Sequence, residues 1–294
     1  MKRRHFITYS LLFAAGCSAS TVSQGKEENS QGDRPDKLRF AVTDVQGLES
    51  LEADYGPFRA ALESLLDLPI EFFPVENLVA ATPALLSGKV DLVFAGPSEY
   101  LILRARAAAE PIVAVTRPDY YSVMVVKADS DLQALPDLKG KTIAMRAEGS
   151  TASHIWSTKL LMDAGLTLED FQIEMLGDGG LEALLAGNVD AWTDANARVT
   201  RFIEAAGVEN QVRSLIQGEE LPNDVFVARS TLNADFMQEV QMRMIDAQAQ
   251  LLEALVAAPA NSKYQQSAFV TAADASYDEL RAAYRALGQE SLIQ

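Results

Sequence analysis

The sequence predicts an α/β fold made of two similar lobes. Short β-type runs alternate with helical patterns along most of the chain, which favours parallel sheets covered by helices. This order of elements occurs twice, and the repeat is visible in the letters. LLSGKVD at 85–91 and LLAGNVD at 184–190 agree at five of seven positions. Two α/β lobes with a ligand cleft between them therefore fit the pattern better than one large sheet.

In the first copy, β-type runs surround two helical patterns. Apolar residues recur with helical spacing between 58 and 66. A short helix over 82–86 accepts Pro83 in its first turn and ends before Gly88, because glycine commonly follows a helix end. The expected strands are 38–42, 69–75 and 90–94.

The second copy repeats this order. A helix is expected over about 153–163, ended by Gly165, and a second over about 181–185, followed by Gly187. The expected strands are 141–145, 171–176 and 189–192.

Two apolar runs, 122–126 and 225–228, are predicted to be the hinge crossings between the lobes. A helical stripe from Phe236 to Leu255 predicts that the C-terminal helices return to cover the first lobe. The predicted domains are 37–122 with 228–294 for lobe 1, and 123–227 for lobe 2.

The first 17 residues, MKRRHFITYSLLFAAGC, are predicted to be a lipoprotein-type signal peptide. Their apolar run is far shorter than the ~20 residues that a membrane-spanning helix needs. AAGC resembles a bacterial lipobox, so Cys17 is the expected lipidation site. The alternative is an unmodified cysteine within a cleaved signal. The arginine pair also resembles the twin-arginine pattern, so the export route stays open.

Residues 18–36 are polar, contain Gly and Pro and lack aromatic side chains. Such a composition predicts a flexible tether. The expected location is therefore periplasmic, with the protein attached to a membrane through a lipid anchor.

The charge and the rare residue types exclude several functions. With 25 Lys and Arg against 41 Asp and Glu, the 294-residue chain has a formal net charge of −16. No nucleic-acid partner is expected, because phosphate backbones require a basic surface. One Cys and two His exclude a Cys-rich zinc or iron–sulfur centre and leave little for a His-based metal site. Neither a metal nor a cofactor is predicted.

Four loops follow the predicted strands: 43–47, 95–100, 146–154 and 193–196. In open α/β sheets, ligands bind beyond the carboxyl ends of the strands. The stretch EGSTASH, which ends at His154, leaves a strand and opens a helix. Free backbone N–H groups and the positive end of a helix suit an anion there. Helix capping alone is the alternative, but three hydroxyls exceed what one cap needs.

Other side chains near these loops are also candidates. Tyr55 and Tyr100 offer O–H groups from the first copy, and core packing is the alternative for each. Asp178 and Asp194 follow strands of the second copy, where carboxylates attract a cationic substituent; solvated surface acids are the alternative. His154 alone is more typical of an exposed or packed residue than of a ligand contact.

Three stretches resemble a known family: DYGPF at 54–58, GPSEY at 96–100, and SVMVVKADSDLQALPDLKGKTIAMRAEGSTASH at 122–154. Over roughly 38–228 the chain is similar to the phosphate-, phosphite- and phosphonate-binding proteins of ABC importers. The resemblance implies a type II periplasmic binding protein fold, with two α/β lobes, a ligand cleft and two hinge crossings. It also implies the transmembrane permease subunit of an ABC importer as a partner.

In that family a Ser-Thr-Ser turn at a helix start, a nearby His and tyrosines from the opposite lobe hold the anion. The resemblance assigns these roles to Ser150, Thr151, His154, Tyr55 and Tyr100. Ala152 takes the third place in the turn, which keeps the backbone N–H and loses a hydroxyl. Asp178 and Asp194 fall about where the family has carboxylates for the amino group of aminoalkylphosphonates.

The leading prediction is a lipid-anchored, extracytoplasmic substrate-binding protein that delivers a phosphonate, phosphite or phosphate to an ABC permease, without catalysis. An alternative within the same fold is a receptor for another small solute, such as a sulfonate or a carboxylate. A third possibility is an exported hydrolase that uses Ser150 or Ser153 with His154. The sequence argues against it, because it has no G-x-S-x-G elbow and no evident acidic partner for a triad.

Overall fold

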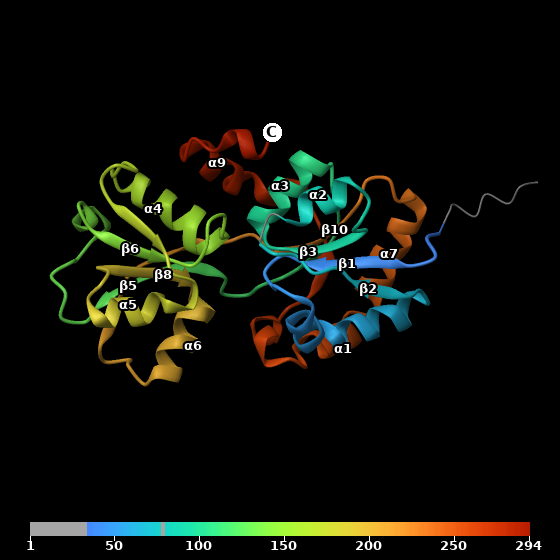
Figure 1. Ribbon diagram of the computed structural model, residues 1–294, viewed down its shortest axis with the longest axis horizontal. Coiled ribbons are helices and arrows are strands. Elements are labelled where there is room, and N and C mark those ends of the chain that lie inside the picture. Colours follow the sequence, from blue (N-terminus) through green and yellow to red (C-terminus); the bar gives the residue numbers. More distant parts are fainter. Residues whose placement is uncertain (1–33, 78–79) are drawn as a thin grey trace, which may run out of the picture. The chain divides into compact units, whose positions relative to one another are not determined.

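The structure is a computed structural model that describes residues 34–77 and 80–294. The described residues form two α/β lobes, so the predicted architecture is confirmed (Figure 1). The predicted signal peptide (1–17) with Cys17, and most of the predicted tether (18–36), lie outside the described residues. No helix in the described ranges combines the length and the apolar character needed to span a membrane.

The sheet of the first lobe has six strands within the described residues, in the order β11-β4-β10-β3-β1-β2. Its strands are β1 (Leu38–Val42), β2 (Ile70–Phe72), β3 (Leu92–Ala95), β4 (Glu110–Val115), β10 (Asp224–Ala228) and β11 (Phe269–Thr271). β1 runs parallel to β2 and β3, whereas β10 inserts antiparallel between β3 and β4. The carboxyl ends of β1 and β3 therefore meet at one edge of the sheet.

Helices cover both faces of this sheet. They are α1 (Leu48–Leu66), α2 (Ala81–Leu86), α3 (Pro97–Ala107), α7 (Ala234–Asp246), α8 (Gln248–Val256) and α9 (Asp278–Ala286). Because side chains alternate along a strand, Phe40 and Val42 point to one face and Ala41 to the other. The first face packs against α1, α7 and α8, and the second against α2, α3 and α9.

The sheet of the second lobe has the order β7-β6-β8-β5-β9. Its elements are β5 (Tyr121–Lys127), β6 (Thr142–Met145), the π-helical turn η2 (Thr151–Trp156), α4 (Ser157–Asp163), β7 (Gln172–Met175), α5 (Gly180–Ala186), β8 (Ala191–Ala195), α6 (Asn196–Ala206) and β9 (Val212–Glu220). β6 is parallel to β7 and β8, as the βα repeat predicts. α4 covers one face, and α5 and α6 cover the other (Figure 1).

The crossings between the lobes differ from the prediction. The run 122–126 lies in β5, which pairs with β8 and β9, and the run 225–228 lies in β10, which pairs with β3 and β4. Both are interior strands, because an apolar run buried between two neighbours makes a better strand than a link. The chain instead crosses at 116–120 and 221–223, and Asp224 already belongs to the first sheet.

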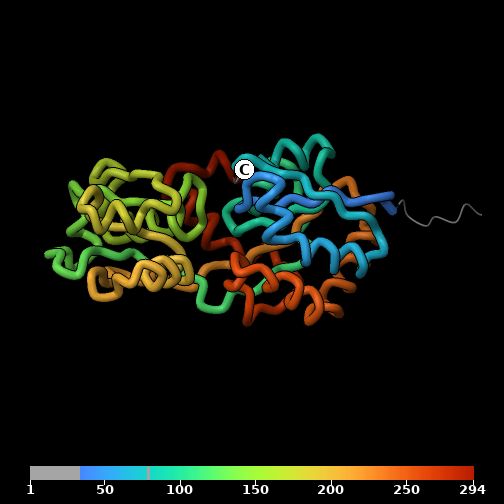
Figure 2. The backbone as a smooth tube through the Cα atoms, turned by 60° about the horizontal axis from the view of Figure 1, so that its bottom comes forward, coloured from blue at the N-terminus to red at the C-terminus, as the bar shows by residue number. Residues whose placement is uncertain are grey.

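The last helix departs from the predicted role of the C-terminus. α7 and α8 pack on the first lobe as predicted, but α9 contacts α3 in one lobe and η2 and α4 in the other. Figure 2 shows the C-terminal segment passing between the two halves. One apolar cluster therefore includes Tyr100 from the first lobe, Trp156 from the second, and Leu280 and Tyr284 from α9.

Candidate functional site

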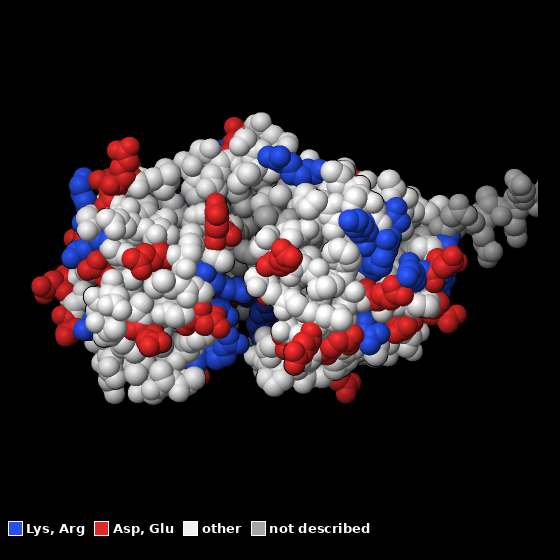
Figure 3. All heavy atoms as spheres, viewed as in Figure 1, with Lys and Arg blue, Asp and Glu red and all other residues white. Residues whose placement is uncertain are grey.

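A cavity of about 580 Å³ lies between the two lobes. Each of the four loops predicted from the sequence contributes residues to its lining. Most of the rest comes from α1, α6, the 116–120 crossing, Asp224 at the start of β10 and the segment 260–264. Figure 3 shows basic side chains gathered in the hollow between the lobes, although acidic side chains are frequent on the outer surface. The cavity lining thus brings five basic side chains together with six acidic ones, so the charge that a small ligand meets depends on how these groups are paired.

The wall from the second lobe is built on the turn that opens η2. The N–H groups of His154 and Ile155 both donate to the carbonyl oxygen of Ser150, at 3.0 Å each. The bond from Ile155 spans five residues, which makes the first turn wider than that of an α-helix. Such π-helical turns are frequent at functional sites. Ser150, Thr151 and Ala152 all line the cavity.

Hydroxyl groups beneath this turn hold it in place. Ser153 Oγ donates to the carbonyl oxygen of Thr193 at 2.6 Å and accepts from the backbone N–H of Arg146 at 2.8 Å. Ser157 Oγ lies 2.6 Å from Thr193 Oγ1 and 2.6 Å from Ser122 Oγ. These side chains are fully buried. Ser153 and Ser157 therefore anchor the turn to β6, β8 and β5 and do not face the cavity.

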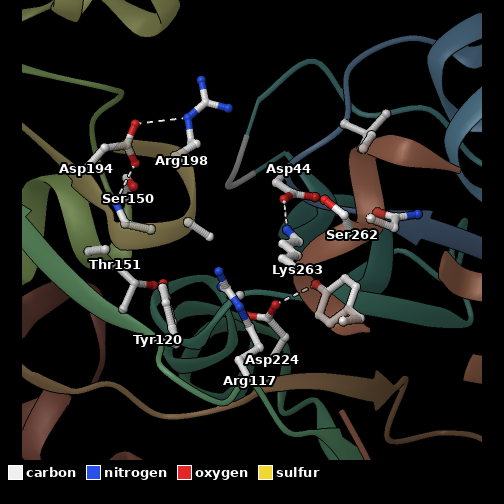
Figure 4. A pocket seen from close by; sticks show the side chains of 18 of the residues that line it. Asp44, Arg117, Tyr120, Ser150, Thr151, Asp194, Arg198, Asp224, Ser262 and Lys263 are labelled. Atoms are coloured by element: carbon white, nitrogen blue, oxygen red, sulfur yellow. Dashed lines mark hydrogen bonds and ion pairs between the residues drawn. The ribbon is translucent and has the colours of Figure 1, made fainter. Parts of the chain in front are cut away.

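Thr151 connects the two lobes. Its Oγ1 accepts from the backbone N–H of Ser98 at 3.0 Å and lies 2.7 Å from Ser98 Oγ. Ser98 stands in the first turn of α3, so the start of one helix in each lobe meets at the cavity. Tyr120, in the crossing, also interacts with the Thr151 hydroxyl (Figure 4).

The wall from the first lobe consists mostly of paired charges. Asp44 accepts from Lys263 Nζ at 2.9 Å (Figure 4). Burial raises the pKa of Asp44, but Lys263 and Arg146 lower it further, and the net pKa is about 2. Arg117 pairs with Asp224 at 3.3 Å, and Tyr264 donates to the same carboxylate at 2.5 Å. These four charges largely neutralise one another within the wall.

Tyr55 is the predicted tyrosine that the structure places in the lining. It is 1% exposed, and its ring meets Phe94 edge-on at 6.3 Å. Burial raises the pKa of its hydroxyl well above the usual value, and the carboxylate of Asp44 adds to the effect. The hydroxyl therefore remains protonated and has a hydrogen to donate.

Tyr100 lies away from the cavity, contrary to the prediction. Its hydroxyl donates to Asp274 at 2.5 Å, and its ring packs on Tyr277 with centroids 4.5 Å apart. The reason is the phase of α3: successive residues turn by about 100° round a helix. Glu99 consequently faces the cavity and Tyr100 faces α9.

Two further predicted residues are absent from the lining, and a third is already engaged. His154 Nδ1 accepts from the backbone N–H of Gly149 at 3.0 Å, and burial lowers the pKa of the ring. Asp178 is an exposed side chain paired with Arg198. Asp194 lines the cavity, but it pairs with Arg198 at 2.9 Å. Neither carboxylate is free for an amino group, because both share one guanidinium.

Of the eleven charged residues in the lining, Asp194 was predicted from the sequence and ten were missed, among them Arg146, Glu99, Arg117 and Lys263. Arg146 and Glu99 stand inside two of the predicted loops, so the topology rule already contained their positions. Arg117 and Lys263 come from a crossing and from the C-terminal third, and nothing in their local sequence indicates a site. Their contribution depends on the return of the chain to the first lobe.

Comparisons with known proteins agree with this fold. A phosphate-import protein, PhnD, of Mycolicibacterium smegmatis is 23% identical over 249 residues, which are 78% of this chain and 77% of that protein. The structure of XAC2383 from Xanthomonas citri bound to ATP superposes with a TM-score of 0.73 at 15% identity, covering 87% of this chain and 98% of the other. PhnD1 from Prochlorococcus marinus in complex with methylphosphonate gives 0.69 at 20% identity, with 87% and 100% covered.

At these identities the two structures show a shared fold alone. The family itself is shown by a sequence model described as the phosphonate ABC transporter periplasmic substrate-binding protein, which matches residues 40–277. Because that match spans well over half of the sequence, this chain belongs to the periplasmic substrate-binding proteins of phosphonate ABC transporters.

Proposed function

We propose that this chain binds a small phosphorus oxyanion (a phosphonate, phosphite or phosphate) in the cavity between the lobes and delivers it to an ABC permease. The observation that carries this proposal is the turn at the start of η2. The N–H groups of Thr151, Ala152 and Ser153 have no hydrogen-bond partner among the described residues, and the first two residues line the cavity. Unpaired N–H groups at a helix start attract an anion.

The family and the relatives support the same ligand class. The curated relative is named for phosphate import, and one structural neighbour holds methylphosphonate. The formal charge of −16 does not oppose an anionic ligand. Charges farther away than about 8 Å are largely screened at physiological salt, whereas the donors of the turn act at contact distance. The function proposed is binding and delivery, with no chemical step.

A calorimetric titration of the purified chain tests this proposal. The panel contains phosphite, phosphate, methylphosphonate, 2-aminoethylphosphonate and methanesulfonate, each at the same pH and ionic strength. We expect saturable binding of at least one phosphorus oxyanion, and a gain in stability of about 2.7 kcal/mol when that ligand is present at 100 times its Kd. Binding of methanesulfonate alone would show a sulfonate receptor instead. Binding of none of the five would remove the proposed function.

We also propose that the protein is exported and held at a membrane by a lipid on Cys17. The support is the sequence: a basic start, a short apolar run and the lipobox-like AAGC. Cys17→Ser should move the protein from the membrane fraction to the soluble fraction of the cell envelope, with the same affinity for the anion. Retention of that variant on membranes would contradict the lipid anchor.

A further inference from the structure

We propose that Arg146 and Glu99 together make the site selective for a fully deprotonated phosphoryl group, a dianion, over singly charged anions. The inference rests on the proposed function and deepens it. Arg146 comes from the second lobe and Glu99 from the first, and both line the cavity beside the anion-binding turn. Arg146 supplies a positive charge, and Glu99 in its acid form supplies a hydrogen-bond donor.

Arg146 carries a charge that the protein leaves unpaired. Arg117, Arg198 and Lys263 each form an ion pair with a carboxylate of the same lining. Arg201 also lines the cavity and has no ion pair in the described ranges, but it is exposed and its guanidinium lies over the phenyl ring of the next residue. The guanidinium of Arg146 has no hydrogen bond and no ion pair within the described residues. A guanidinium offers five N–H donors in a planar fork that matches two oxygens of a phosphoryl group.

The backbone of Arg146 is held on both sides. Its N–H donates to Ser153 Oγ at 2.8 Å, and its carbonyl oxygen accepts from the N–H of Gly177 at 3.0 Å. Burial lowers the pKa of Arg146, but Asp44, Asp194 and the other facing acids raise it more, so the net shift is upward. Arg146 therefore stays charged, and its backbone is held at the cavity lining before a ligand arrives.

Glu99 also has a side-chain group without a partner among the described residues, in its case a carboxyl oxygen. Its side chain is 5% exposed, and its Oε2 is buried with no hydrogen-bond partner in the described part of the chain. The carboxyl group lies against Gly96, where an added Cβ would come within 2.6 Å of Oε2. A buried polar oxygen without a partner is costly, and nearly all such atoms in native proteins are satisfied. A ligand oxygen in the cavity is the missing partner.

The surroundings of Glu99 favour the acid form. Burial raises its pKa most, its own backbone N–H opposes this, and Asp44 and Asp224 raise it further, while Arg146 lowers it; the resulting pKa is about 8. The hydroxyls of Tyr120 and Tyr284 also face it, and both remain protonated because burial raises their pKa. At neutral pH the Glu99 carboxyl therefore has an O–H to donate, as a carboxylate would not.

The two groups make binding depend on pH in a defined way. A dianion forms as the ligand loses its second proton, so affinity should rise with pH through that ionisation. Above a pH of about 8 the free protein loses the Glu99 proton, and the Kd should then increase by up to tenfold per pH unit. The sign follows from the bound state, in which the anion favours protonated Glu99.

The experiment is calorimetry of the full chain with inorganic phosphite and with methanesulfonate between pH 6 and 9.5. Arg146→Gln should weaken phosphite binding by roughly 10- to 100-fold, the factor expected for a charged hydrogen bond, and should affect methanesulfonate less. Arg285→Gln is the matched control, because it removes an exposed cation that pairs with Glu290 outside the cavity. Its phosphite affinity should equal that of the wild type.

Glu99→Gln tests the proposed role of the Glu99 acid as a hydrogen-bond donor to the ligand. The amide keeps a donor and cannot ionise, so the loss of affinity above pH 8 should disappear while the rise through the second ionisation of phosphite remains. Glu253→Gln, an exposed change in α8 with the same effect on net charge, is the control. The pH dependence of the stability of the ligand-free protein gives a second measurement. The stability that Glu99 contributes should be lost as pH rises from about 5 through 8 in the wild type, and Glu99→Gln should lack that decline.

The outcomes separate this inference from the function on which it rests. If the wild type binds none of the phosphorus oxyanions, both are wrong. If it binds phosphite, and Arg146→Gln binds it as tightly, the function stands and the selectivity for a dianion is wrong. An unaltered pH profile in Glu99→Gln would remove the acid donor from the proposal in the same way.

Discussion

The core of the first lobe is a stack of phenyl rings, whereas the second lobe, beneath its binding turn, contains a network of hydroxyl groups. Phe226 lies 4.2 Å from Phe94 between ring centroids, at 11°, and also stacks on Phe58 and Phe269. The second lobe has apolar clusters on both faces of its sheet, and beneath the turn at 150–153 it also buries four small polar side chains, Ser122, Ser153, Ser157 and Thr193.

The difference shows how one architecture serves two purposes. Apolar burial stabilises without a preferred direction and in proportion to the area removed from water, so the stacked rings mainly stabilise the first lobe. Hydrogen bonds are directional, so the second lobe uses them to orient the backbone of Arg146 and the turn that follows. Of these two features, the rings should therefore matter more for stability, and the hydroxyls more for ligand affinity.

The largest expected effect is on the ring stack. Phe226→Ala should lower the free energy of unfolding by about 3–5 kcal/mol, because it removes a buried ring from contact with four others. Urea denaturation measures this loss. Leu86→Ala, at a position that is 68% exposed, is the control and should stay within about 0.5 kcal/mol. A loss below 1 kcal/mol in Phe226→Ala would show that the stack is not the main support of the lobe.

A smaller loss of stability, with a larger loss of function, is expected in the hydroxyl network. Ser153→Ala leaves the Arg146 N–H and the Thr193 carbonyl oxygen without this partner, and should cost about 1–3 kcal/mol. Phosphite affinity should fall as well, because the backbone of Arg146 is then held only through its carbonyl oxygen. Paired denaturation and titration experiments measure both, with the exposed Ser276→Ala as the control. Full affinity in Ser153→Ala would show that the network only stabilises.

The contact between the lobes should matter less than either interior. Thr151→Val removes the oxygen that accepts from Ser98, and we expect phosphite to bind up to roughly tenfold more weakly. Ser98→Ala, which removes one of the two bonds, should show part of the loss. Thr271→Val, an exposed change in β11, is the matched control in titration. If Thr151→Val and Thr271→Val bind alike, the hydroxyl has no part in holding the lobes on the ligand.

The smallest effect on affinity is expected at His154. The ring accepts from Gly149 and is absent from the lining, so His154→Gln should change the Kd by less than about threefold. Stability should respond instead. Burial lowers the pKa of the ring, so its contribution is present above about 6.5 and is lost as the pH falls below that value. A tenfold loss of affinity would return His154 to the binding site.

Much of the fold could be predicted from local pattern, because strands and helices place apolar residues at regular spacings. The motifs LLSGKVD and LLAGNVD then showed that the order of elements occurs twice. The crossings were not predictable from local pattern, since the run 122–126 reads as apolar whether it links two sheets or lies inside one. The four loops of the site followed from topology. The direction in which each side chain of α3 points could not be predicted in this way. As a result Tyr100 was predicted to face the cavity, whereas the structure places its neighbour Glu99 there. Lys263 became visible only through tertiary contact with Asp44.

The position of α9 has a mechanical consequence. It packs on α3 in one lobe and on η2 and α4 in the other, within a single apolar cluster that contains Leu280 and Tyr284. A rotation that widened the cleft would pull these surfaces apart and wet them, at a cost of roughly 25 cal/mol for each Å² exposed. The contacts of α9 with both lobes thus favour the closed arrangement of the cleft. Opening the cleft costs free energy because it exposes apolar surface to water, and closing the lobes buries that surface again.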